Sequence, residues 1–422
     1  MIARAVVGSV VLIATALVHR VSAAPLVDEQ ALRRAGLCKY WEANLPLTRA
    51  EAIERAYLLD NALYVTTTLG KLFAVQADVG LIRWAAPLTK PALVIFKPAH
   101  LRQRDGAPLT IVSTTETTFV IDRFTGDVVQ RFRPRFRASG PAVGFGDALF
   151  MGGMDGRFYS VGWDPGDVFA TTVRWEVDVG SAVTASPALY TGPRLVLATS
   201  TGRVFCCYAA DKALQWSFAT GGAILGDPIA EDDGVYIASV DRSLYRLDAD
   251  RGWLVWRTRF PAPLAEGPVL AGHTVFQFCP GDGLSAVDAD TGRIQWRVPN
   301  GRTFAAHLGD NPVIFAADGE LLVVDRESGA SLSRIAADGV FQAVPNGRTD
   351  AAYLLSSEGR VLCVRPAEVP YVRLREMASA RERLNLPPAE DTAASDLAEG
   401  ASQETAGPTV EDPFRSRADI VP

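Results

Sequence analysis

The sequence is poor in the residues on which most metalloproteins and hydrolases depend. Its 422 residues include only five cysteines and four histidines. Past residue 23 the histidines are His100, His273 and His307, and no two of them have the spacing of metal ligands. Neither a nucleophile elbow nor a phosphate-binding loop occurs. We therefore predict no catalytic residues, no metal site and no bound cofactor.

The sequence also lacks an apolar run of the roughly 20 residues that a membrane-spanning helix needs. Its N-terminus has Arg4, then the shorter apolar run 5–18, then small residues up to Ala24. This order is typical of a secretory signal. We predict a signal peptide over residues 1–23, cleaved after Ala23, with an uncleaved anchor as the alternative. Because no cysteine follows closely, we expect no lipid attachment there.

The charge and cysteine content limit the remaining classes. A net charge of −6 without a basic excess argues against a nucleic acid partner. An odd number of cysteines in an exported chain leaves at least one thiol unpaired, so disulfides cannot be the framework of the fold. What the chain does have is 36 glycines and 26 prolines in a 48% hydrophobic sequence, a composition typical of many short strands joined by tight turns.

An internal repeat of about 40 residues is the strongest signal in the sequence. One copy runs from Asn61 to Gln76 and is followed by Gly80 and Trp84. Another runs from Asp233 to Asp248 and is followed by Gly252 and Trp256. The residues that end the second strand of each copy are Gln76, Asp122, Gly162, Tyr208, Asp248, Asp288, Asp325 and Arg365. Eight copies predict a ring of eight β-sheet blades.

Each part of the repeat has a structural role. The Asp caps turn amides and the Gly takes a positive φ, so together they close a hairpin. Recurring aromatic side chains are expected in the core between blades. They are Phe73, Phe119, Tyr159, Phe205 and Tyr245 on the second strand, and Trp84, Trp175, Trp216, Trp256 and Trp296 on the third. A weaker strand before each copy often carries proline, which suits the edge beside the central channel. The pairs are Gly140-Pro141, Ser186-Pro187, Asp227-Pro228 and Gly267-Pro268.

The last copy has no Gly and Trp after it, so its sheet lacks an outer strand. The segment around Trp41 has the spacing of that missing strand. We therefore predict an all-β, eight-bladed β-propeller of four-stranded antiparallel blades over residues 24–371, closed by the N-terminal strand. Residues 372–386 are predicted to be a short helical segment, and residues 387–422 a disordered acidic tail.

The step from Leu284 to Trp296, with its apolar-Ala-apolar-Asp run, Thr-Gly turn and Trp, resembles the PQQ-like repeat family over residues 38–368. Members of that family include quinoprotein dehydrogenases, which hold pyrroloquinoline quinone and calcium, and BamB-type scaffolds of outer-membrane assembly, which hold no cofactor. The compact size of the chain is similar to that of the scaffolds. The resemblance implies a non-enzymatic, protein-binding scaffold of the periplasm or cell envelope. The alternatives are a PQQ-dependent oxidoreductase and a propeller that binds a small ligand or glycan.

Adjacent cysteines bear on the quinoprotein alternative, because such enzymes join two neighbouring cysteines in a ring against the quinone. Cys206 and Cys207 align with Ala74-Val75 and Ala286-Val287, which lie inside a predicted strand. Successive side chains of a strand point to opposite faces, so a bond between the two would break the pleat. We predict two separate buried thiols.

Two basic stretches are candidates for partner binding. Arg131, Arg133, Arg135 and Arg137 alternate with Phe and Pro along the predicted outer strand of blade two. If extended, they share one face. They serve either as protection of a sheet edge or as a docking site for an acidic partner. The second stretch is the long connection from Lys90 to Asp105, with Lys97, Arg102 and Arg104. We expect a monomer whose partners are other envelope proteins, with peripheral membrane association left open.

Overall fold

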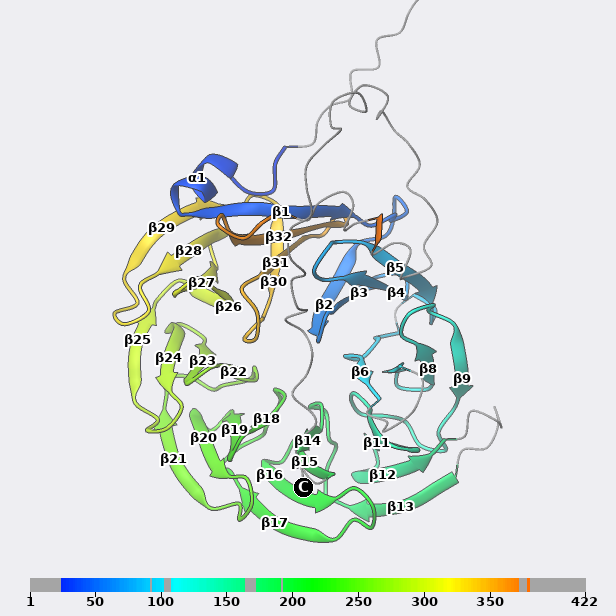
Figure 1. Cartoon of the computed structure of the whole chain (residues 1–422). Helices are drawn as coiled ribbons and strands as arrows, with labels where there is room; N and C mark the ends of the chain where they lie inside the picture. The colour runs from blue at the N-terminus through cyan, green and yellow to red at the C-terminus, as the bar shows by residue number, and fades with distance from the viewer. Residues whose placement is uncertain are drawn as a thin grey trace, which may run out of the picture.

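The computed structural model describes residues 24–91, 93–101, 108–163, 172–190, 193–371 and 378–379. These residues form a closed ring of eight four-stranded antiparallel sheets (Figure 1). Apart from helix α1 (Glu29–Arg34) the ring is built of strands. The predicted all-β, eight-bladed propeller is therefore confirmed. No described helix has the length and apolar character needed to cross a bilayer.

The strands of each blade follow one another from the central channel outward. Blade one contains β2 (Ile53–Leu59), β3 (Ala62–Thr67), β4 (Lys71–Gln76) and β5 (Ile82–Pro87). Blade two contains β6 (Ala99–His100), β7 (Leu109–Ser113), β8 (Thr118–Asp122) and β9 (Val128–Phe132). Blade three contains β10 (Val143–Phe145), β11 (Ala148–Gly152), β12 (Arg157–Gly162) and β13 (Thr172–Asp178). Blade four contains β14 (Ala188–Tyr190), β15 (Arg194–Ala198), β16 (Arg203–Tyr208) and β17 (Leu214–Ala219).

The second half of the ring repeats this order. Blade five contains β18 (Ile229–Glu231), β19 (Gly234–Ser239), β20 (Ser243–Asp248) and β21 (Leu254–Arg259). Blade six contains β22 (Val269–Ala271), β23 (Thr274–Cys279), β24 (Gly283–Asp288) and β25 (Ile294–Val298). Blade seven contains β26 (Gly301–Leu308), β27 (Asn311–Ala316), β28 (Glu320–Val324) and β29 (Ser331–Ala336). Blade eight contains β30 (Val340–Val344), β31 (Ala352–Ser356), β32 (Arg360–Pro366) and, outermost, β1 (Leu37–Asn44).

Blade eight shows how the ring closes. Strand β1 pairs antiparallel with β32, and Trp41 lies opposite Cys363. The two chain segments that meet at this blade are far apart in the sequence, with 318 positions between Glu42 and Arg360. Figure 1 shows them side by side as the blue strand β1 and the orange-brown strand β32. Closure by the N-terminal strand is confirmed. It gives the last blade a fourth strand and leaves no open sheet between blades eight and one.

Hydrophobic side chains form eight separate clusters, one at each junction between neighbouring blades. The predicted core tryptophans of the outer strands are all buried in them. At six junctions the indole N–H of one blade donates to a backbone carbonyl of the next, over 2.8 to 3.1 Å. These bonds are Trp41 to Ala77, Trp84 to Arg123, Trp175 to Ala209, Trp216 to Ala249, Trp256 to Ala289 and Trp296 to Arg326. The Trp of the repeat therefore joins blades as well as filling the core.

Two local expectations were wrong. The outer strand of blade two ends at Phe132, so Arg133, Arg135 and Arg137 lie in the connection that follows and do not share a strand face with Arg131. The stretch from Lys90 to Asp105 is not only a connection, because it contains the innermost strand of blade two, β6.

Three predicted segments fall largely outside the described residues. They are the signal peptide over 1–23, the acidic tail over 387–422, and the helical segment over 372–386, of which only residues 378–379 are described. These three remain predictions.

Candidate functional site

The predicted basic surface lies at the junction of blades one and two. Arg131 and Arg133 line a cavity of about 350 Å³ together with Lys90 and Glu116. Three cations face one carboxylate there, so the cavity carries net positive charge. Arg137 contributes from the side, because its Nη2 lies 3.4 Å from Oε1 of Glu116. The structure thus brings Arg131, Arg133 and Arg137 together around one acidic residue.

The four arginines of this surface differ in role. The guanidinium of Arg131 lies over the ring of Phe119, 5.4 Å from its centroid. Arg257 covers Tyr245 at the equivalent place in blade five, 5.2 Å from that centroid. Arg131 is therefore explained in part by the repeat itself, as a cation over an aromatic ring. Arg133 and Arg135 are exposed, and no carboxylate of the described chain pairs with either.

The connection that carries these arginines is held in place by one aromatic contact. Phe136 stacks on Tyr159 of β12, with ring centroids 3.7 Å apart and planes 7° apart. This contact bridges blades two and three, where the outer strand of blade two has Gln130 at the position that Trp occupies in six other blades. The arginines on either side of Phe136 are therefore presented from an anchored segment.

Lys97 lies elsewhere and has a partner. Its Nζ is 2.7 Å from Oδ2 of Asp227, and Oδ1 of Asp227 accepts the backbone N–H of Ser186. Burial lowers the pKa of Lys97, but the Asp227 carboxylate outweighs it and holds the pKa above its ordinary value. Blades two and five are three positions apart, so this ion pair spans the central channel. Lys97 is not part of the Arg131 surface.

A second ion pair also spans the channel. Arg348, between β30 and β31 of blade eight, lies 3.7 Å from Glu231 at the end of β18 in blade five. Nearby on blades one and two, Asp60 bonds His100 at 2.7 Å, and this hydrogen bond holds the pKa of Asp60 below its ordinary value. Lys97, Arg348 and Asp60 thus each have a charged or hydrogen-bonding partner on another blade.

Arg102 and Arg104, the other two candidates of that stretch, lie outside the described residues. Sequence reasoning missed Asp227 as a partner of Lys97. A signal for it existed. Lys97 precedes Pro98 as Asp227 precedes Pro228, so both lie two residues before an inner strand.

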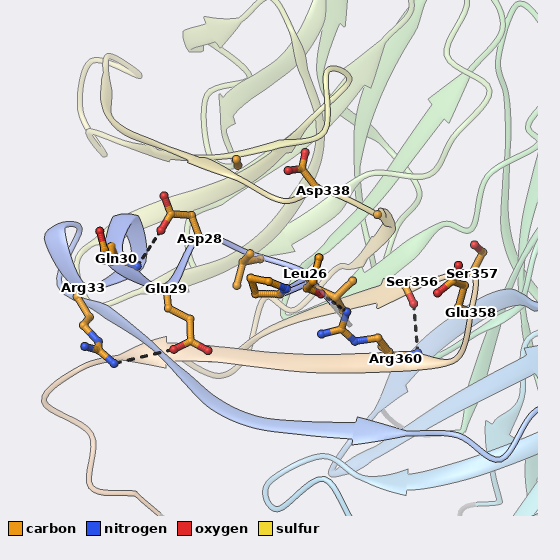
Figure 2. Close-up of a pocket in the computed structure, with 15 residues that line it drawn as sticks. Leu26, Asp28, Glu29, Gln30, Arg33, Asp338, Ser356, Ser357, Glu358 and Arg360 are labelled. Carbon is orange, nitrogen blue, oxygen red and sulfur yellow. Dashed lines mark hydrogen bonds and ion pairs between the residues drawn. The ribbon is translucent and has the colours of Figure 1, made fainter. Parts of the chain in front are cut away.

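A second cavity, of about 910 Å³, lies where the N-terminal segment crosses blades seven and eight (Figure 2). Most of its charged groups are committed to structure. Asp28 caps α1 through the amides of Gln30 and Ala31, and Arg360 binds Glu42 and the carbonyl of Ala24. Figure 2 shows Asp28 on the N-terminal segment and Arg360 on the facing strand β32, both lining the cavity. We interpret this cavity as part of the contact between the N-terminal segment and blades seven and eight.

The two adjacent cysteines occupy strand β16, as predicted. Cys206 belongs to the cluster between blades four and five, and Cys207 to the cluster between blades three and four. Both are buried free thiols, and burial raises the pKa of Cys206 to about 11 and that of Cys207 to about 12. They point to opposite faces, so they do not fit the ring of two adjacent cysteines that the resemblance to quinoprotein dehydrogenases would imply. No cluster of three or more His, Cys, Asp or Glu side chains suited to a metal ion occurs within the described part of the chain.

Fold, repeat and register together define the molecule as an eight-bladed β-propeller, and its repeats resemble PQQ-like repeats. The chain resembles BamB: the family described as outer membrane protein assembly factor BamB matches residues 168–304 and 280–368. Among solved structures, BamB from Moraxella catarrhalis is similar with a TM-score of 0.62 and 17% identity, over 79% of this chain and 99% of that one. The computationally designed Ika8 protein is similar with a TM-score of 0.58 and 14% identity, over 76% and 98%. No curated protein matches in sequence. At these identities the structural likeness establishes the fold alone.

Proposed function

We propose that the chain is a non-enzymatic, protein-binding scaffold of the periplasm or cell envelope, and that it holds acidic partner segments at the surface formed by Arg131, Arg133, Arg135 and Arg137. One observation carries the proposal: Arg133 and Arg135 are exposed and have no carboxylate partner in the described chain. Both lie on a connection that the stacking of Phe136 on Tyr159 holds in place. Guanidinium groups bind carboxylates in a bidentate manner. The match to a family described as an outer membrane assembly factor supports the same kind of role.

Retention of envelope proteins on the immobilised protein tests this proposal. We expect the double variant Arg133→Ser/Arg135→Ser to lose partners that the parent retains at about 0.1 M salt. Raising the salt to about 1 M should release the same partners from the parent, since the screening length then falls to roughly 3 Å. The charge-matched control is Arg293→Ser/Arg326→Ser on blades six and seven. An identical set of retained proteins for both variants would refute the docking role.

The non-enzymatic part of the proposal has its own test. The purified protein is incubated with pyrroloquinoline quinone and calcium and then desalted. We expect no quinone absorbance in the protein fraction, because the cysteines point to opposite faces and Lys97 is already paired with Asp227 across the channel. Retention of one quinone per chain would contradict it.

A further inference from the structure

The outer edge of blade five carries an exposed apolar run that the repeat does not require. Three consecutive residues form this apolar edge: Trp253, Leu254 and Val255, which are 67%, 48% and 50% exposed. Leu254 and Val255 are the first two residues of β21, and Trp253 directly precedes them, after the turn that ends at Gly252. Large exposed apolar patches of this kind mark interaction sites more often than chance surface.

The repeat itself supplies the comparison that makes this edge unusual. In blade six the equivalents of Trp253 and Val255 are Arg293 and Gln295. In blade four they are Ala213 and Gln215, and only the middle position keeps an exposed leucine. The same fold is thus built with polar or small residues on both sides of that position. Closure of the ring does not explain Trp253 and Val255.

The register shows where these side chains point. Leu254 lies opposite Leu247, which belongs to the cluster between blades four and five. Directly opposed residues of an antiparallel pair share a face, so Leu254 faces blade four. Val255 has no counterpart on β20, because the register shifts by one residue at this place. Such a bulge re-aims a side chain, and at Val255 the side chain is half exposed at the rim.

A basic region continues from the apolar edge along the same strand. The guanidinium of Arg257 lies over Tyr245, whose ring belongs to the cluster between blades four and five, so Arg257 also faces blade four. Arg259 lies two residues further and shares this face. Asp241 lies 3.6 Å from Arg257, whereas no described carboxylate pairs with Arg259. Strand β21 is therefore apolar at one end and basic at the other.

The backbone and the charge of β21 define the occupant. It is the outermost strand of blade five, so one edge of its backbone is unpaired within the described chain, and it contains no proline. An extended peptide can pair with such an edge through main-chain hydrogen bonds. Arg257 and Arg259 favour carboxylates at one end of that peptide. A second copy of this chain fits less well, because its own β21 contains no carboxylate to offer.

We infer that the edge of β21 receives an extended segment of a partner protein, which adds to the sheet as a fifth strand, places apolar side chains against Trp253, Leu254 and Val255, and turns acidic side chains to Arg257 and Arg259. Strand addition of this kind gains its affinity from backbone hydrogen bonds and its specificity from the side-chain contacts. This inference rests on the proposed scaffold function and names a second surface for it.

Synthetic peptides of strand length test the edge directly. The probes alternate valine with threonine and carry two glutamates at one end or at the other, and their binding is followed by fluorescence anisotropy. We expect one of the two to bind. The same peptide with lysines for glutamates, or with N-methylated backbone amides, should bind at least about tenfold more weakly, which corresponds to about 1.4 kcal/mol.

Matched variants come from the repeat. The variant Trp253→Arg/Val255→Gln introduces the residues that blade six already has at these positions, so we expect the variant to fold. We expect it to bind the peptide at least about tenfold more weakly. The reverse change, Arg293→Trp/Gln295→Val, should add a second site on blade six, where Arg297 occupies the place of Arg257.

Three outcomes would overturn the inference. They are equal binding of the glutamate and lysine peptides, binding unchanged by the Trp253 variant, and a dimer of the parent that this variant abolishes. If these peptides fail while Arg133 and Arg135 still retain envelope proteins, only the edge of β21 is refuted and the proposed scaffold function stands.

Discussion

The indole N–H of Trp41 donates to the backbone carbonyl of Ala77 over 3.1 Å, which ties the N-terminal strand of blade eight to blade one. A Cβ placed on Gly80 would come within 2.6 Å of the same indole ring. Trp41 therefore occupies, at the closure of the ring, the position that Trp84, Trp216, Trp256 and Trp296 occupy at other junctions. The ring is thus closed by the same contact between Trp and Gly that joins these blades.

The first prediction concerns this closure. Trp41→Ala removes the indole and its hydrogen bond, and large-to-small changes at packed aromatic positions cost about 3 kcal/mol or more. We expect a urea midpoint well below that of the parent. The control is Trp253→Ala, which removes an indole that is 67% exposed and should stay within about 0.5 kcal/mol. Equal midpoints for the two variants would show that Trp41 does not secure the ring.

The second prediction separates backbone strain from steric clash at the Trp contact. Gly80 has φ +72° and packs against Trp41, whereas Gly281 has φ +76° and no atom within 4 Å of its notional Cβ. Gly281→Ala should therefore cost only the left-handed backbone term, about 1 kcal/mol. Gly80→Ala has the same backbone cost. It also displaces the indole of Trp41, which costs about 1 to 3 kcal/mol more. Thermal melts of both variants measure the difference, and equal losses would exclude a tight contact.

The third prediction concerns the thiols. All five cysteines are buried and free, and burial raises the pKa of Cys206 to about 11 and of Cys207 to about 12. The thiolate is the reactive form, so native protein at about pH 8 should react slowly with iodoacetamide. After unfolding in urea without reductant, mass spectrometry should find all five cysteines alkylated. A peptide in which Cys206 and Cys207 remain joined would contradict the placement of these residues on opposite faces.

Much of the fold could be predicted from the sequence because each blade repeats the same local chemistry. The anchor residues from Gln76 to Arg365 lie at or within one residue of the end of the third strand of each blade, and the outer strand around Trp41 is recognisable from its spacing. The strand signal in blade two is misleading. Pro134 has no N–H to donate and follows Arg133, so pairing stops at Phe132 even though the alternation of arginines continues.

The candidate site was harder to predict than the fold. The cavity around Arg131 and Arg133 is also lined by Lys90, which lies in the connection after blade one. Whether Lys90 lies close to these arginines depends on the angle between the two blades. The pairing of Lys97 with Asp227 depends on the curvature of the whole ring, since the two residues are 130 positions apart in the chain. Local patterning identifies the residues that precede each inner strand, but it does not say which of them face each other across the channel.

The last prediction tests that cross-channel pair. The pKa of Lys97 is held above its ordinary value of 10.5 because the Asp227 carboxylate favours the charged form. A raised folded-state pKa means that the stabilisation is complete below about pH 10.5 and is lost as pH rises through the folded value. The difference in melting temperature between the parent and Lys97→Met should therefore be constant from about pH 8 to about pH 10 and shrink above it. Charge exchange supplies the control: Lys97→Asp and Asp227→Lys should each lower the melting temperature, because each leaves two like charges facing across the channel. The double exchange should recover most of the loss, since it restores an opposite pair at the same two positions. If the double variant is as unstable as the sum of the single ones, Lys97 and Asp227 do not interact across the ring.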